Sequence, residues 1–566
     1  MKLLKFMILA AMGVSFASCH DLDLTPLSQG SSESWYSNEN EIRMSVNNFY
    51  KIDFWGQDGD DNHDWSDDGM RRQEPSEIER GVLNGQSGIV STLWNNQYKL
   101  IARTNTVLES VDRAIENGAN PAKINQYIGE TKFARAVAYF KLVSRFGDVP
   151  LILTNINIEE GLTKGRTPKA DVIKQIYQDF DDAIELLPTT TSGEVRATKG
   201  AAMAYKARAS LYLGDFSVAA KAAKDCMDLG VYSLHPDFGE FFHASTRKSP
   251  ERIFAIPRSI ELDQYVGSYL AQNVLPRTRG GWMAKCPSWA LLASFTCTDG
   301  LPVDESPLFD CHDPFKNRDP RLSETIIPFG SVFLGVVFDP NPYTTQVMNY
   351  NTGSMVSNTD SHGVAEYASF NSLGWKKGVD ESWTQNGYKT ENDLIDMRYA
   401  DVLLMYAEAK IELNEIDQSV IDAMNEVRAR AYGVDKSDTD NYPEFTILPQ
   451  AKMRTQLRVE RRMEFANENR RFSDIMRWRI ADQVYTNEYA HPRDVAKQKK
   501  NVDDDNWFWP CNPEIDENGI PTFEHMAATG CVDLMSKRNW DDRQYLWPIP
   551  TNEVLINKNM KQNPGY

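Results

Sequence analysis

One charged segment near the C-terminus, residues 457–479, constrains the fold more than any other part of the chain. Its sequence, LRVERRMEFANENRRFSDIMRWR, repeats apolar side chains at nearly helical spacing, which predicts one buried stripe along a helix. That stripe contains Val459, Met463, Ala466, Phe472, Ile475 and Met476. Opposite charges three or four positions apart, such as Arg461 and Glu464, become neighbours on a helix surface. We therefore expect a structural helix with ion pairs on its solvent face, rather than a catalytic site.

The size and charge of the chain narrow its possible partners. It has 566 residues, of which 41% are hydrophobic, so it can form a large core with more than one sub-region. Lys plus Arg number 61 and Asp plus Glu number 80, which gives a formal net charge of -19. Because an acidic surface repels polyanions, we do not expect nucleic acid as a partner. A neutral ligand such as a glycan stays compatible with this charge.

The N-terminal residues are a targeting segment rather than part of the fold. A short apolar run, residues 6–16, follows two lysines and is too short to span a bilayer. Small residues then precede Cys19, as at a bacterial lipoprotein cleavage site. We expect residues 1–18 to be a signal peptide, Cys19 to carry a lipid, and residues 19–37 to be the tether. An ordinary signal peptide with a chance cysteine is the alternative.

Six further cysteines follow Cys19, and a location outside the cytoplasm would permit disulfides. They are Cys226, Cys286, Cys297, Cys311, Cys511 and Cys531. None forms a CxxC pair, which argues against a zinc site. Cys511 and Cys531 lie in one loop-like region, so they are the first pair to test, although the sequence leaves the pairing open.

Helical periodicity recurs in pairs of segments. Residues 198–230 divide into two helices around a Leu-Gly-Asp turn at 213–215, with alanines on their facing sides. Two helices in about 33 residues with small-residue packing predict a tetratricopeptide-like unit. Residues 397–431 repeat this pattern. Residues 93–115 and 121–150 predict longer amphipathic helices.

The composition changes between these helical blocks. In residues 232–396 Gly, Pro, Ser and Asn become more frequent and helical periodicity fades, which predicts irregular structure with short strands. We therefore predict a mainly α fold: a tetratricopeptide-like superhelical scaffold with an inserted loop-rich region containing short strands. The scaffold comprises residues 38–231 and residues 397–566, and the insertion comprises residues 232–396.

Four stretches resemble signatures of the SusD/RagB outer-membrane lipoproteins of Bacteroidetes. They are the charged segment above, ETKFARAVAYFKLVSRFGDVP at 130–150, RYADVLLMYAEAK at 398–410 and LWPIPTNEVLINKNMKQNPGY at 546–566. The resemblance runs from Cys19 to the C-terminus and is thinnest in the insertion. It implies a lipid-anchored protein of the outer-membrane surface that captures oligo- or polysaccharide for a SusC-like TonB-dependent transporter, without catalysis or a cofactor.

The resemblance also implies a ligand site built from loops before the third helix and from the insertion. A pyranose has apolar C–H faces and a polar edge, so flat aromatic rings with a few polar side chains suit it. We therefore predict ligand contacts from Trp65, Asp67, Arg71, Arg72, Trp94, Asn96, Tyr265, Tyr269, Trp282, Trp289, Trp375 and Trp383. Core packing is the competing interpretation for each tryptophan, and we expect at least two or three of the rings to be exposed in one cleft.

Other functions stay open at this point. The sequence lacks GxSxG, HExxH, P-loop and GxGxxG motifs, although a surface glycoside hydrolase would need only two carboxylates at a set separation. Oligopeptide capture would use backbone hydrogen bonds in a groove, and a scaffold for protein contacts alone is a further alternative. The Asp-rich loop at 56–69 offers Asp64 and Asp68 to calcium. Pro75, however, occupies the position where an EF-hand needs a bidentate Glu, so we expect no metal there.

Overall fold

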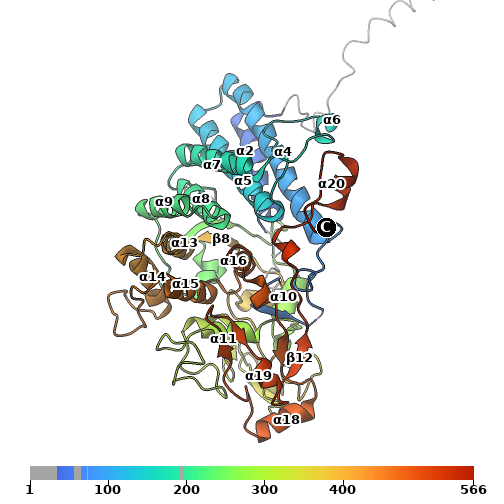
Figure 1. Cartoon of the computed structure of the whole chain (residues 1–566), viewed down its shortest axis with the longest axis vertical. Coiled ribbons are helices and arrows are strands. Elements are labelled where there is room, and N and C mark those ends of the chain that lie inside the picture. Colours follow the sequence, from blue (N-terminus) through green and yellow to red (C-terminus); the bar gives the residue numbers. More distant parts are fainter. Residues whose placement is uncertain (1–34, 57–64, 73, 192, 194) are drawn as a thin grey trace, which may run out of the picture.

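The computed structural model describes residues 35–56, 65–72, 74–191, 193 and 195–566. Cys19 and Asp64 lie outside these residues. A stack of helices occupies one end of the molecule, and a loop-rich part occupies the other end (Figure 1). The predicted fold class is confirmed: the chain is mainly helical, and its strands are few and short.

The helices are α2 (Glu39–Asn47), α3 (Ile52–Trp55), α4 (Gly88–Glu116), α5 (Pro121–Phe146), α6 (Ile158–Gly161), α7 (Lys169–Leu186), α8 (Lys199–Leu213), α9 (Phe216–Asp228), α10 (Ser268–Val274), α11 (Trp289–Ser294), α12 (Arg321–Thr325), α13 (Tyr399–Glu412), α14 (Gln418–Ala431), α15 (Gln450–Phe465), α16 (Arg471–Trp478), α17 (Ala481–Val484), α18 (Val495–Asp503), α19 (Glu524–Ala527) and α20 (Thr551–Ile556).

The strands are β1 (Gly69–Arg71), β2 (Arg252–Ile256), β3 (Lys285–Pro287), β4 (Val332–Phe333), β5 (Val336–Val337), β6 (Gln346–Asn349), β7 (Ser354–Ser357), β8 (Leu394–Arg398), β9 (Glu488–Ala490), β10 (Glu514–Ile515), β11 (Pro521–Thr522) and β12 (Asp533–Ser536). They form small antiparallel sheets, the largest of which has the order β4-β5-β6-β7.

The scaffold is a stack in which each helix packs on the next. Helix α4 contacts α5, α5 contacts α7, α8 contacts α9, and α9 contacts α13, which in turn packs on α14 and α15. The predicted turn between α8 and α9 is confirmed: Gly214 adopts φ 86°, and the Asp215 side chain caps α9 by accepting a hydrogen bond from the backbone N–H of Val218. A left-handed glycine followed by an N-cap residue reverses the chain tightly, which makes adjacent helices antiparallel.

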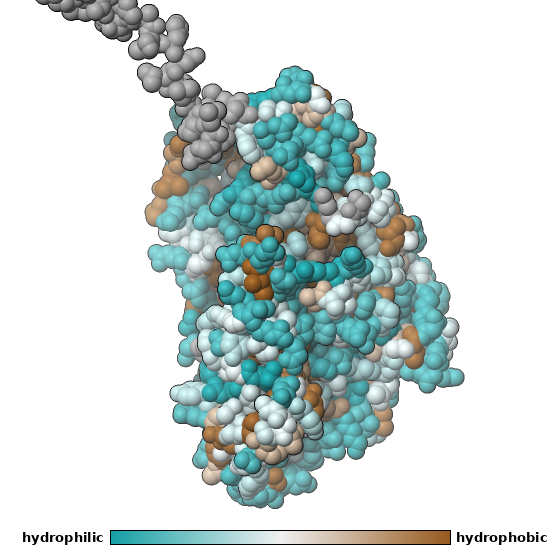
Figure 2. Space-filling model, turned by 180° about the vertical axis from the view of Figure 1, so that it is seen from behind, coloured by the Kyte–Doolittle hydropathy of each residue, from teal (hydrophilic) through white to brown (hydrophobic). Residues whose placement is uncertain are grey.

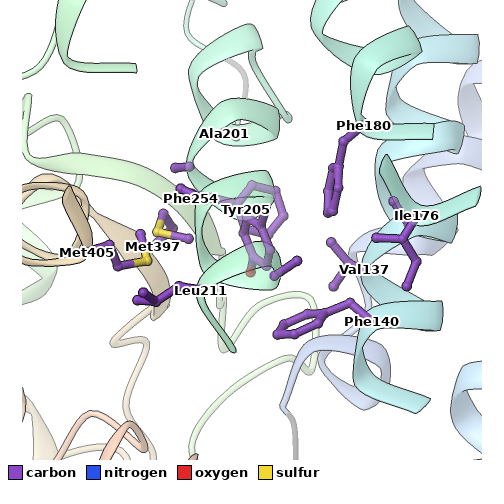
Figure 3. Close-up of a cluster of buried hydrophobic side chains, with 14 of the residues drawn as sticks. Val137, Phe140, Ile176, Phe180, Ala201, Tyr205, Leu211, Phe254, Met397 and Met405 are labelled. Atoms are coloured by element: carbon purple, nitrogen blue, oxygen red, sulfur yellow. The ribbon is translucent and has the colours of Figure 1, made fainter. Parts of the chain in front are cut away.

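The core of the stack lies between α5, α7 and α8. Figure 3 shows Val137 of α5, Phe180 of α7 and Tyr205 of α8 pointing toward one another, with Phe254 of β2 beside them. The rings of Tyr205 and Phe254 lie 5.8 Å apart in an edge-to-face arrangement. Alanines along α8, including Ala201, are fully buried and allow its neighbours to approach closely.

Two strand pairs connect the loop-rich part to the helical stack. Strand β2 pairs with β8, so the chain enters and leaves the loop-rich region at the same place. Strand β1, which precedes α4, pairs with β3 in that region. Residues far apart in sequence are thereby brought to one location.

The prediction of one continuous helix over residues 457–479 is wrong. Helix α15 ends at Phe465 and α16 begins at Arg471. Between them Asn467 and Asn469 adopt φ angles of 61° and 60°, a left-handed conformation that asparagine tolerates better than most residues. The helical periodicity of the sequence therefore did not reveal the sharp turn between α15 and α16.

The prediction that the charges of this segment lie on a solvent face is also wrong. Glu464 is completely buried and forms ion pairs with Arg321 at 2.9 Å, with Arg398 at 2.6 Å and with Arg430. Arg461, equally buried, pairs with Asp401 on α13 rather than with Glu464. Because α12, β8, α13 and α14 cover these helices, most of the ion pairs join different elements, whereas Arg477 and Asp474 pair within α16.

The arginines keep the buried carboxylates ionised. Burial alone would raise the pKa of Glu464, but Arg430, Arg398 and Arg321 outweigh it, so this pKa lies well below its usual range. Burial likewise opposes ionisation of Asp396, whereas Arg470 and Arg208 bring its pKa down to about 2. The network therefore consists of charged groups at neutral pH.

The described cysteines are free thiols, and Cys511 and Cys531 do not form a disulfide. Cys511 precedes β10, which pairs with β11, whereas Cys531 precedes β12, which pairs with β9.

In the part of the chain that the structure describes, no helix is both long and apolar enough to cross a bilayer. The face shown in Figure 2 is mostly hydrophilic, and its apolar residues form small separate groups. Recognition on that face would therefore use small clusters rather than a broad apolar area.

Candidate ligand-binding surface

The pairing of β1 with β3 determines the position of Arg72. The register places Arg71 opposite Lys285, and the next residue, Arg72, donates its backbone N–H to the Ala284 carbonyl at 2.8 Å. The Arg72 guanidinium donates to the carbonyls of Trp282 and of Tyr367, the latter at 2.7 Å. One arginine therefore holds two loops of the inserted region together.

Three exposed aromatic rings lie on or beside the loops that this arginine joins. Tyr269 on α10 is 63% exposed, Trp282 is 38% exposed and Tyr367 is 49% exposed. The rings of Tyr269 and Trp282 meet edge to face, with centroids 5.7 Å apart and planes at 72°. The Arg72 guanidinium carbon lies 5.5 Å from the Tyr367 ring centroid. We call Arg72, Tyr269, Trp282 and Tyr367 the aromatic surface.

The backbone around Trp282 is held in one conformation. Trp282 donates its N–H to the Gln272 carbonyl, and Met283 donates to the Leu275 carbonyl at 3.2 Å. A Cβ at Gly281 would lie only 1.9 Å from the Leu275 carbonyl oxygen, so only glycine fits there. Because the loop is already ordered, a ligand that stacks on Trp282 would pay little conformational entropy.

Burial lowers the pKa values of two side chains at the aromatic surface, Arg72 and His362. It lowers the pKa of Arg72 from its ordinary value, with Arg277 adding a smaller effect in the same direction. His362 is buried, and its Nε2 lies 3.1 Å from the Ser369 carbonyl oxygen. Burial, aided by the charges of Arg493 and Arg72, lowers the pKa of His362 to about 4. This histidine is therefore neutral at pH 7.

Comparison with known proteins identifies the family. Residues 250–566 match the model described as the SusD family, and residues 32–213 match one described as "Starch-binding associating with outer membrane". The chain belongs to the SusD family. SusD-like protein P2 of Formosa agariphila is 26% identical, and the alignment covers 98% of both chains.

Solved structures of SusD-like proteins share the fold. A SusD-like carbohydrate binding protein from Bacteroides fragilis matches with a TM-score of 0.76 and 28% identity, covering 93% of this chain and 99% of that one. A laminarin binding SusD-like protein matches with a TM-score of 0.64 and 19% identity, covering 94% of this chain and 100% of that one. The second match, at its lower identity, shows a common fold.

Four of the tryptophans predicted to contact ligand lie instead in the core of this SusD-family chain. They are Trp65, Trp94, Trp289 and Trp375, all of them buried. Trp65 packs edge-on against Phe472 at 5.5 Å, and Trp289 lies 5.8 Å from Trp509. A ring covered by other side chains cannot stack on a sugar, so these four are removed from the candidate site.

Asp67 and Asn96 connect elements of the scaffold. Asp67 is buried and pairs with Arg471 at 2.7 Å and with Arg462 at 2.8 Å, which fastens the segment before β1 to α15 and α16. Asn96 on α4 donates to the Asp53 carbonyl at 3.1 Å. The prediction that Asp67 contacts ligand is therefore corrected: arginines occupy its oxygens.

Tyr265 and Trp383 lie apart from the aromatic surface. The Tyr265 ring is half-buried and lies 4.3 Å from the Lys389 ammonium group. Trp383, also half-buried, lines a separate cavity of about 160 Å³ together with Leu270 of α10. Arg71 is half-buried at the end of β1. Of the predicted ligand-binding residues, Arg72, Tyr269 and Trp282 come together.

The sequence did not reveal Tyr367. It lies in an irregular segment of the inserted region without periodicity, so no local pattern separates it from other loop tyrosines. Its place in the surface depends on the bond from Arg72, which is 295 positions away in sequence. Only the folded chain shows that contact.

The weak calcium prediction also has no support in the described residues. Asp68 pairs with Arg462 at 2.9 Å, so a cationic side chain already occupies its carboxylate. Within residues 35–56, 65–72 and the described residues from 74 onward, no group of His, Cys, Asp and Glu side chains is arranged to hold a metal ion.

Proposed function

We propose that this SusD-family protein captures an oligo- or polysaccharide at the aromatic surface and delivers it to a TonB-dependent outer-membrane transporter. The observation that carries this proposal is the group of exposed rings at Tyr269, Trp282 and Tyr367 around one fixed arginine. The similarity to the Bacteroides fragilis carbohydrate binding protein supports a glycan as the ligand. Capture requires no bond to be made or broken.

The geometry suits a curved chain of sugars. The planes of Trp282 and Tyr269 differ by 72°, so two successive sugar rings with different orientations could each contact one aromatic face. In this proposal residues 232–396 form the ligand-facing insertion, with Arg72 contributed from the segment before α4. The helical stack is then free to contact the transporter, and a lipid on Cys19 holds the protein at the cell surface.

A calorimetric screen of the lipid-free mature chain against glycans and oligopeptides tests the ligand class. With a glycan that binds, Trp282→Ala should lower affinity about tenfold or more, the loss of one stacked anchor residue, while the unfolding temperature is unchanged. Tyr350→Ala is the matched control, because Tyr350 is 63% exposed, like Tyr269, but lies beyond β6 in the four-stranded sheet.

Three outcomes would contradict the proposal. Binding of oligopeptides without any glycan would overturn the ligand class. Release of reducing ends from the bound glycan would show catalysis. Equal losses of affinity in Trp282→Ala and Tyr350→Ala would remove the aromatic surface from the site.

The anchor and the transporter need separate tests. Cys19→Ser should abolish incorporation of labelled fatty acid and release the protein from the outer-membrane fraction. Purification of the lipidated protein in mild detergent should recover a TonB-dependent transporter. Retention of the label in Cys19→Ser, or the absence of a transporter, would contradict the corresponding part of the proposal.

A further inference from the structure

Three arginines gather at the aromatic surface. Arg72 and Arg493 both approach the Phe370 ring, with guanidinium carbons 5.5 Å and 4.4 Å from its centroid. Arg277 begins the turn that leads to Trp282 through Gly280 and Gly281, and its charge acts on Arg72. Within the described part of the chain, none of these three arginines forms an ion pair.

The carboxylates near these arginines form no ion pair with them among the described residues. Asp360 is buried, and it accepts hydrogen bonds from the backbone N–H groups of Arg277 at 2.6 Å and Thr278 at 3.3 Å. Asp494, next to Arg493 in sequence, caps α18 by accepting from the Ala496 N–H at 2.9 Å. Glu366, next to Tyr367, is exposed and forms no ion pair among the described residues. Among the described residues, therefore, no ion pair neutralises these three guanidinium groups.

The positive charge of these arginines contrasts with the negative charge of the chain as a whole. The net charge is -19, so the average surface repels anions. At physiological ionic strength, however, the Debye length is about 8 Å, so distant acids are screened and the local arginines dominate at the surface. Guanidinium groups match carboxylate and sulfate oxygens in pairs, which makes arginine suited to holding such anions.

We propose that the captured glycan is anionic, bearing uronate carboxylates or sulfate esters, and that Arg277, Arg493 and Arg72 hold these groups beside the aromatic rings. This inference rests on the proposed function, since it names the class of glycan for the same surface. The rings contact the apolar faces of the sugars, and the arginines contact the charged substituents. A neutral glycan would bring no negative charge to these three arginines.

Matched pairs of polysaccharides test the inference with the lipid-free mature chain. One arm compares polygalacturonate with its methyl-esterified form, and the other compares a sulfated carrageenan with its desulfated form. The acidic member should bind about tenfold or more tightly in at least one arm, and the preference should shrink as salt is raised, because the attraction is electrostatic. The arm that shows the preference distinguishes carboxylate from sulfate recognition.

Two variants connect the preference to the arginines. Arg493→Gln and Arg277→Gln should each lower affinity for the acidic polysaccharide about threefold to tenfold and leave affinity for the neutral one unchanged. Arg479→Gln is the control matched to Arg493: Arg479 is exposed as well and lies against a ring, with its guanidinium carbon 4.1 Å from the Tyr545 centroid. It should bind both members as the unmodified protein does.

The outcomes separate this inference from the proposed function. Equal affinity for charged and neutral members would overturn the inference and leave glycan capture intact. A preference for the acidic member that is undiminished in both Arg→Gln variants would also overturn it. Binding to none of the polysaccharides would overturn the proposed function, and the inference with it.

Discussion

Two arginine-rich regions of this molecule behave in opposite ways. Around α15 and α16, buried arginines pair with carboxylates from several elements; Arg398, for example, pairs with Glu251 at 2.8 Å and with Glu464 at 2.6 Å. At the aromatic surface, Arg72 instead donates to backbone carbonyls and lies against the Tyr367 ring. The first region satisfies its charge within the protein, and the second leaves charge available at the surface.

The difference shows how one residue type serves structure and recognition. A buried charge must be paired, because burial without a partner costs several kcal/mol. A partly exposed guanidinium can stay unpaired in water and is then available to a ligand. The pairing of an arginine, rather than its presence in the sequence, therefore separates the scaffold from the candidate site.

Removing the shared carboxylate of the buried network should produce the largest effect. Glu464→Gln would remove the one carboxylate that Arg321, Arg398 and Arg430 share, and the expected loss is about 3–5 kcal/mol of unfolding free energy. Urea denaturation measures it. Glu415→Gln, on an exposed loop, is the control and should change stability by less than about 0.5 kcal/mol. Similar losses in both variants would break the distinction between the two regions.

The pH dependence of stability tests the burial of His362, whose pKa the charge of Arg72 helps to lower. The folded pKa of His362 is lowered from 6.5 to about 4, so its contribution to stability is complete above pH 6.5 and is lost as pH falls toward 4. The shift corresponds to roughly 3 kcal/mol over the whole interval. His362→Gln should therefore lose less stability than the unmodified protein between pH 7.5 and pH 4.5, measured by thermal unfolding. Parallel losses would show that His362 protonates freely in the folded state.

A smaller effect should follow from moving the Trp282 loop. Gly281→Ala places a methyl group 1.9 Å from the Leu275 carbonyl oxygen, so the backbone must shift at a cost of about 1–3 kcal/mol. Glycan affinity should fall with it, because Trp282 follows directly. Gly88→Ala, where no atom lies within 4 Å of the added methyl group, should keep both stability and affinity. Unchanged affinity in Gly281→Ala would mean that the position of Trp282 matters little.

Local patterns predicted the helical stack well. The turn at 213–215 and the helices on either side follow from glycine and aspartate acting within one turn of chain. The same reasoning failed over residues 457–479, because two asparagines in left-handed conformations interrupt an otherwise helical pattern. Periodicity identified which faces are apolar but not which charged faces another element covers.

The candidate site was predictable only in part. Arg72, Tyr269 and Trp282 were named from composition and family resemblance, as were Trp94 and Trp375, which are buried. Tryptophan suits a core and a sugar platform equally, so residue type alone cannot separate the two. Whether a tryptophan is buried or exposed depends on distant segments of the chain, and this burial separates core residues from residues of the candidate site.

The sequence alone determined the mainly helical class, the helical hairpins and the family, because these depend on residues that are neighbours along the chain. Only the tertiary structure decided which charges are buried and which rings are exposed. The β1–β3 pairing brings Arg72 to a tryptophan 210 positions later, and the covering of α15 turns predicted surface ion pairs into a buried network. Such contacts form between distant segments, and local propensity and periodicity contain no information about them.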